Sequence, residues 1–179
     1  MSAIETNVIT NALHALFLFA YFAGALWHYL KGDKRFTGLI VLFFFLILAI
    51  KLLGVVAHNP AFKAYYADVW MMIAIGVLML NYTLTHAMKM PQFIEFIVMI
   101  ATFVFVAINI RTDNFLYLAL AQLIVYTIAA TYSHRGVRFG FVMVIVSNVV
   151  WIGMREIGGL YLGYTVPEAL RYDNDVYHI

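Results

Sequence analysis

Residues 37–57 read TGLIVLFFFLILAIKLLGVVA, a run in which Lys51 is the one charged side chain. A helix needs about 20 apolar residues to cross the hydrocarbon core of a bilayer. The run lacks the alternation of a half-buried β-strand, and the backbone groups of a chain in lipid must be paired internally. Residues 37–57 therefore predict a membrane-spanning α-helix.

The composition of the whole chain favours the same environment. Of its 179 residues, 65% are hydrophobic and 11% are charged, which is too little polar surface for a soluble domain. The chain has no Cys, which excludes disulfides and thiolate metal sites, and its net charge of +2 contains no basic run typical of nucleic-acid binding. We expect a single transmembrane domain over residues 1–179, with membrane lipids as partners and no nucleic acid.

Six apolar runs are long enough to be spans, and short polar breaks separate them. They cover residues 10–30, 37–57, 69–88, 91–110, 115–133 and 137 to about 157. The N-terminal segment lacks the basic region with which a signal peptide begins, so we expect the first run to remain in the protein as a membrane span. Short connections place successive helices antiparallel. The predicted fold is all-α, an up-and-down bundle of six transmembrane helices with a polar C-terminal segment, in which residues 158–170 form an interfacial element or, alternatively, a seventh span.

The charges of the loops predict an orientation. We call the end of the bundle that holds the N-terminus side A and the other end side B. The predicted side-B loops carry Asp33 and six basic residues: Lys31, Lys34, Arg35, Lys89, Arg135 and Arg138. The excess of Lys and Arg in cytoplasmic loops then places side B in the cytoplasm of a multi-pass cell-membrane protein, with the N-terminus outside.

Polar residues that could do chemistry gather at side A. His14 lies near the start of the first run, His58 follows the second, and Asp68 precedes the third. Lys51 lies seven residues before His58, within about 20° on a helix, so both fall on one face and Gly54 would leave room between them. A charge at this depth is costly, so we expect Lys51 either to be neutral at pH 7 through desolvation or to be paired. Its expected partners are an anionic group of a ligand or one of the side-A carboxylates Asp68, Asp113 and Glu156.

The histidines of the two ends differ in their surroundings. Imidazole and carboxylate groups are good ligands for zinc, so side A suits a metal ion, whereas side B holds His28, His86 and His134 among Lys and Arg. The alternative is that each histidine is an interfacial anchor or is solvated. The candidate metal ligands at side A are His58, His178 and Asp68.

A second spacing indicates a different cofactor. His14 and His28 are fourteen residues apart, which is about 21 Å of helical rise with about 40° of drift. Two histidines on one face near opposite membrane surfaces are typical of proteins that hold haem b by axial imidazoles. His14 and His28 are therefore alternative cofactor-binding residues of an electron-transfer subunit.

Two stretches resemble a known family. They are GVVAHNPAFKAYYADVW, residues 54–70, and YDNDVYHI, residues 172–179. Together they resemble bacterial members of the seven-helix membrane hydrolase superfamily that includes alkaline ceramidases and progestin/adiponectin receptors. The resemblance implies a zinc ion that activates water against an amide, with His58 as the early ligand and His178 as the second member of the late pair. Asn174 stands where the family has the first member, so Asp173 or Asp175 would take its place as a ligand or act as the base.

These patterns leave three functional classes open. The first is a metal-dependent hydrolase of a lipid or an amide, with catalytic Asp173 and Asp175 and with His14 and Asp68 as ligands or supporting residues. The second is a haem- or pigment-binding electron-transfer subunit that uses His14 and His28, and the third is a non-enzymatic subunit of a larger membrane complex.

Overall fold

A computed structural model describes residues 3–112, 114 and 116–153, and within these residues all regular structure is helical. The elements are α1 (Ala3–Leu30), α2 (Gly38–His58), the 3-10 helix η1 (Pro60–Tyr65), α3 (Tyr66–Ala87), α4 (Gln92–Thr112), α5 (Leu116–Tyr132) and α6 (Arg135–Ile152). The all-α prediction is confirmed, and each predicted run contains one helix. Helix α1 begins seven residues before the predicted start at residue 10, because residues 3–9 contain neither Gly nor Pro to stop the helix.

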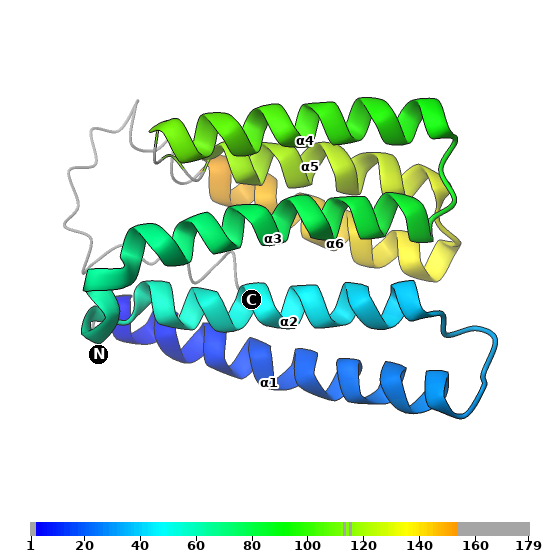
Figure 1. The fold of residues 1–179 in the computed structure, drawn as a ribbon, viewed down its shortest axis with the longest axis horizontal. Helices are drawn as coiled ribbons and strands as arrows, with labels where there is room; N and C mark the ends of the chain where they lie inside the picture. The colour runs from blue at the N-terminus through cyan, green and yellow to red at the C-terminus, as the bar shows by residue number, and fades with distance from the viewer. Residues whose placement is uncertain (1–2, 113, 115, 154–179) are drawn as a thin grey trace.

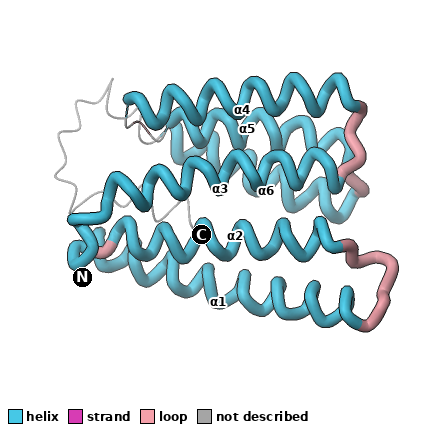
Figure 2. The backbone as a smooth tube through the Cα atoms, in the orientation of Figure 1, coloured by secondary structure: helices cyan, strands magenta, loops and turns pink. Residues whose placement is uncertain are grey.

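The six α-helices run up and down along a common axis (Figures 1 and 2). The turns after α1, α3 and α5 lie at one end, which is side B. The start of α1, η1 and the end of α4 lie at the other end, which is side A. Successive helices pack on one another, and α3 also contacts α5. The arrangement is therefore the predicted antiparallel one.

Local sequence sets the helix ends. The hydroxyl of Thr37 accepts a hydrogen bond of 3.4 Å from the backbone N–H of Ile40 and so caps the start of α2. At side A the amide oxygen of Asn59 accepts from the N–H of Ala61 at 3.0 Å, and Pro60 follows as the first residue of η1. At side B, Gly32 adopts a positive φ of 76° in the turn after α1.

Four helical segments of the described chain are long and apolar enough to cross a membrane. They are Val8–Leu30, Gly38–His58, Pro60–Ala87 and Gln92–Thr112. Helix α5, with 17 residues, and the described part of α6, with 18, are apolar but shorter. The protein thus has the helical character of a multi-pass membrane protein.

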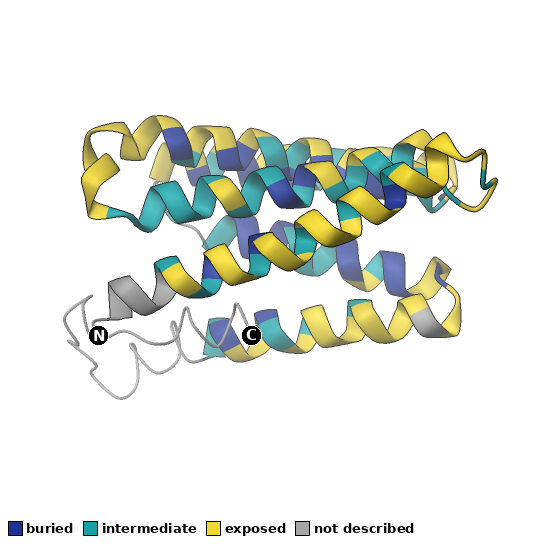
Figure 3. Ribbon diagram, turned by 90° about the horizontal axis from the view of Figure 1, so that it is seen from below, coloured by how far each residue is buried: buried dark blue, intermediate teal, exposed yellow. Residues whose placement is uncertain are grey.

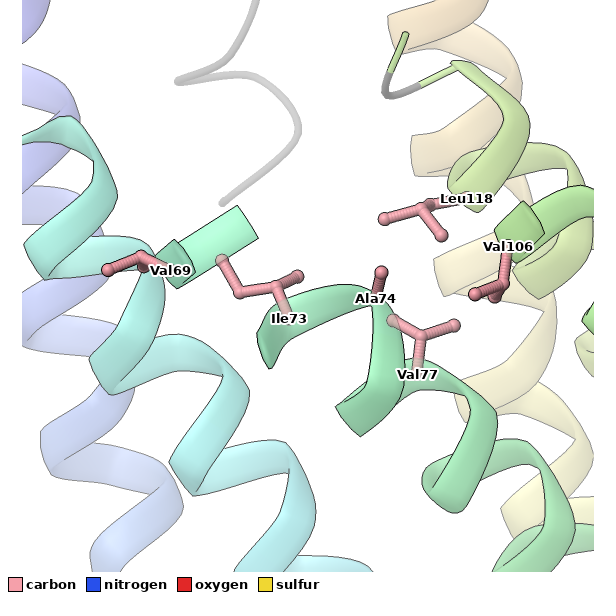
Figure 4. Close-up of a cluster of buried hydrophobic side chains, with 6 residues drawn as sticks. All are labelled: Val69, Ile73, Ala74, Val77, Val106 and Leu118. Atoms are coloured by element: carbon pink, nitrogen blue, oxygen red, sulfur yellow. The ribbon is translucent and has the colours of Figure 1, made fainter. Parts of the chain in front are cut away.

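Two apolar clusters form the interior. The side-A cluster joins Val69, Ile73, Ala74 and Val77 of α3 to Val106 of α4 and Leu118 of α5 (Figure 4). The side-B cluster contains Leu84, Met90, Val98, Val125, Tyr126 and Ala129. Large apolar residues are also exposed on the helices, including Phe93 at 73% exposure and Leu16 at 65%. Figure 3 shows the exposed positions in yellow along the ribbon. Apolar residues both inside and outside are what a bundle in lipid requires.

Candidate functional site

Helices α1 and α2 face each other antiparallel in a regular register. The ring of Tyr21 stacks on that of Phe44 with centroids 6.1 Å apart. Two turns toward side A, His14 of α1 lies within electrostatic range of Lys51 of α2. One turn further, the side chain of Asn11 meets Gly54. The same pair of faces therefore carries aromatic contacts toward side B and polar contacts toward side A.

Gly54 makes room for Asn11 of the neighbouring helix. A β-carbon on Gly54 would lie 3.4 Å from Oδ1 of Asn11, and the Asn11 side chain is buried, with 1% exposure. The nearest neighbour of Gly54 across the helix interface is thus Asn11 of α1, a contact that a single-helix projection does not show.

Asn11 is the member of this site that the sequence reasoning missed. The sequence feature that could have indicated Asn11 is its amide side chain inside the first apolar run, one helical turn before His14. An amide buried between two apolar helices needs hydrogen-bond partners or a function. We name the group formed by Asn11, His14, Lys51, Gly54 and His58 the α1–α2 polar face.

One ring nitrogen of His14, on this face, lacks a hydrogen-bond partner in the part of the chain that the structure describes. This nitrogen is Nδ1, and it is buried. Lys51, across the helix interface, is half-buried, as is the His14 side chain as a whole. A buried ring nitrogen without a partner is costly unless a ligand or water occupies its hydrogen-bonding position.

His58 closes the polar face at side A. It lies in the last turn of α2, and its ring meets Trp70 of α3 edge-on, with centroids 6.0 Å apart and planes at 89°. Trp70 in turn packs against Tyr66 at 5.8 Å. Asp68 lies exposed in the first turn of α3, at the same end of the bundle. The structure therefore places His58, Asp68 and His14 toward side A, as predicted.

The predicted metal site is only partly within the described residues. Among these residues no group of three His, Cys, Asp or Glu side chains could hold a metal ion. His58 and Asp68 by themselves do not make a complete site. The other predicted members, Asp173, Asp175 and His178, lie outside the described residues, as does Asn174. Zinc binding stays a prediction.

The side-B histidines are exposed and two of them lie beside carboxylates. Nδ1 of His28 is 3.4 Å from Oδ2 of Asp33, and its ring stacks on Phe36 at 4.8 Å. Nδ1 of His86 is 3.5 Å from Oε1 of Glu95. His134 is exposed just before α6. These surroundings match the interfacial or solvated alternative for side B.

Asp33 has a second and stronger partner in the same loop. Its carboxylate accepts hydrogen bonds from the Arg35 guanidinium at 2.7 and 3.0 Å. These bonds, and one from the Arg35 backbone N–H, lower the pKa of Asp33 to about 2.

His14 and His28 lie toward opposite ends of α1, so the haem alternative keeps its predicted geometry along one helix and also stays a prediction.

Comparison of the chain with protein-family models, with curated proteins and with solved structures finds no match. The function of the α1–α2 polar face must therefore be argued from the chemistry of its residues.

Proposed function

We propose that this protein is a multi-pass membrane hydrolase that acts on a lipid or an amide at side A, with the α1–α2 polar face as its site. The observation that carries the proposal is the packing of Asn11 against Gly54, with His14 within electrostatic range of Lys51 across the same helix interface and His58 in the last turn of α2. Polar and ionisable side chains inside a membrane segment are costly and are retained for binding or chemistry. The side-B histidines lack such a setting, because they are exposed.

Each residue of the face has a role that its position supports. His58 would contribute one ligand to a metal ion, and its contact with Trp70 fixes the plane of its ring. The buried Nδ1 of His14 is available to exchange a hydrogen bond with a bound molecule. Asn11 packs against Gly54 one helical turn from His14 and so holds α1 against α2 beside this nitrogen.

The proposal includes an orientation. We propose that all six helices cross the membrane and that side A faces outward. The support is the concentration of basic residues at side B, where Lys31, Lys34 and Arg35 follow α1 and Lys89 follows α3. A site at side A would then draw its substrate from the outer leaflet.

A panel of lipids tests the proposed activity. The purified protein in nanodiscs is incubated with amide-linked and ester-linked lipids of matched chain length, and the products are measured by mass spectrometry. We expect cleavage of at least one class, its loss in His58→Ala, and its retention in His86→Ala. His86 is the matched control because it also lies in the last turn of a helix, at side B. No cleavage by the native chain, or equal cleavage by both variants, would contradict the proposal.

The absorption spectrum of the same preparation tests the haem alternative. A Soret band that is lost in both His14→Ala and His28→Ala would replace the hydrolase by an electron-transfer subunit. We expect no such band.

A further inference from the structure

The turns at side B carry basic side chains that no carboxylate balances. Asp33 lies among them, but its carboxylate accepts two hydrogen bonds from the Arg35 guanidinium, at 2.7 and 3.0 Å. Glu95 lies beside His86, with Oε1 and Nδ1 3.5 Å apart. Four further basic residues at this end form no salt bridge with any carboxylate that the structure describes. We name them the basic side-B surface: Lys31, Lys34, Lys89 and Arg135.

Arg138 lies at the same end but has a different role. Its guanidinium donates to the carbonyl of Ala130 at 2.9 Å and to that of Ser133 at 3.1 Å. These bonds satisfy carbonyls at the end of α5, which have no partner within their own helix. Arg138 is therefore engaged inside the protein and is not part of the basic side-B surface.

The local structure of the turns keeps the basic side chains outside. Lys89 adopts a positive φ of 52°, a conformation that residues with a side chain rarely adopt. The next residue, Met90, is buried in the side-B cluster, whereas Lys89 itself is exposed. In the turn after α1, Nζ of Lys31 lies 4.7 Å from the ring centroid of Trp27, a cation–π contact that leaves the lysine exposed. The turns thus bury apolar groups and present cations at the surface.

Exposed aromatic residues at the helix ends indicate what reaches these cations. Trp27 and Tyr29 lie in the last turn of α1 and are 61% and 47% exposed, and Tyr132, the last residue of α5, is 42% exposed. Trp and Tyr at the ends of membrane helices lie at the level of the lipid headgroups. The basic residues follow directly in the turns, which gather at one end of the bundle (Figure 1). They are therefore at the depth of the headgroup phosphates, where a lipid contacts them before a soluble partner does.

We propose that the basic side-B surface binds the phosphate groups of anionic phospholipids in the leaflet that surrounds side B. Ammonium and guanidinium groups donate hydrogen bonds to phosphate oxygens, and their charge favours a net-anionic headgroup over a zwitterionic one. This inference goes beyond the proposed function, which concerns side A, and it requires neither metal nor turnover. Either proposal can fail while the other stands.

Electron spin resonance of spin-labelled lipids tests the inference on the full chain in phosphatidylcholine bilayers. Phosphatidylglycerol and phosphatidylcholine probes with the same acyl chains are compared, and the fraction of each that the protein immobilises is measured. We expect a preference of about threefold for phosphatidylglycerol at about 0.1 M salt. The preference should disappear at about 1 M salt, where the screening length is about 3 Å.

Paired substitutions locate the preference on the molecule. Lys34→Gln combined with Lys89→Gln should reduce it by about half or more, and Lys34→Arg combined with Lys89→Arg should keep it. The matched control is Lys63→Gln combined with Arg111→Gln, which removes two exposed cations at side A. The control should keep the native preference, because the exposed carboxylate of Asp68 shares that end of the bundle.

Four results would overturn the inference. Equal immobilisation of both probes by the native protein would do so without any variant, and so would a preference that high salt leaves unchanged. Equal reductions in the two Gln pairs would show that the preference does not belong to side B. Binding of polyglutamate to the native protein, without a preference for phosphatidylglycerol, would assign the surface to an acidic protein instead of a lipid.

Discussion

Gly76 of α3 lies against Ile50 of α2 so closely that a β-carbon on Gly76 would be 3.0 Å from Cγ1 of Ile50. This approach holds α3 against the helix that carries Lys51 and His58. Small residues at helix interfaces allow such close packing in membrane proteins, where dispersion contacts provide much of the association energy.

Gly76→Ala should destabilise the fold, because the added methyl group forces Ile50 to move within a packed interface. We expect a loss of about 1–3 kcal/mol in the free energy of unfolding, measured by denaturant titration in micelles. Gly24→Ala is the control, since nothing lies within 4 Å of its β-carbon position. Equal effects of the two substitutions would show that the α2–α3 contact is not as close as described.

A buried hydrogen bond between α3 and α4 gives a second prediction. The side-chain N–H of Asn81 donates to the hydroxyl of Thr102 at 3.3 Å, between the two apolar clusters. Thr102→Val removes the acceptor and should cost about 1 kcal/mol in the free energy of unfolding. Thr127→Val is the control, because Thr127 is exposed and its hydroxyl donates to the carbonyl of Leu123 within its own helix. A Thr102→Val protein as stable as the control would contradict the assignment of this bond.

The pair of Asp33 and Arg35 predicts a pH dependence at side B. The folded-state pKa of Asp33, about 2, lies below the ordinary value of 3.8. The stabilisation from this pair is therefore fully present above the ordinary value and is lost as the pH falls through about 2. In Arg35→Gln the pKa of Asp33 should rise toward 3.8, as followed by NMR of the carboxyl carbon. In Lys34→Gln it should stay near its native value, and a similar rise in both would contradict the pairing.

The absence of Cys makes the proposed orientation simple to test. Lys34→Cys places a single exposed thiol at side B, and Lys63→Cys places one at side A. In intact cells an impermeant maleimide should label Lys63→Cys, and it should label Lys34→Cys only after permeabilisation. The reverse pattern would invert the orientation, and labelling of both from outside would contradict a crossing by α2.

The helices could be predicted from the sequence because each apolar run is long and its breaks are polar. The placement of Lys51 and His58 on one face of their helix could also be predicted, since it follows from helical geometry alone. What the sequence could not provide was the register between helices. The packing of Asn11 against Gly54, and the placing of His14 within electrostatic range of Lys51, depend on the position of α1 along α2. No pattern within either helix specifies that position.

The partners of the side-B histidines illustrate the same limit. Asp33 is close in sequence to His28 and is the one acid in the predicted side-B loops. Its contact with His28 arises because the turn after α1 folds the chain back, with the N–H of Asp33 bonded to the carbonyl of His28 at 3.0 Å. Loop geometry of this kind depends on backbone conformation, including the positive φ of Gly32, rather than on periodicity.

The metal content of the purified protein tests the proposed function most directly. The native chain, purified without chelator and analysed by plasma mass spectrometry, should contain about one zinc ion per chain. His58→Ala should contain none, and His86→Ala should keep the native content, because His58 belongs to the α1–α2 polar face whereas His86 lies in the last turn of α3 at side B. A native protein without bound metal, or a His58→Ala protein that holds as much as His86→Ala, would contradict the account.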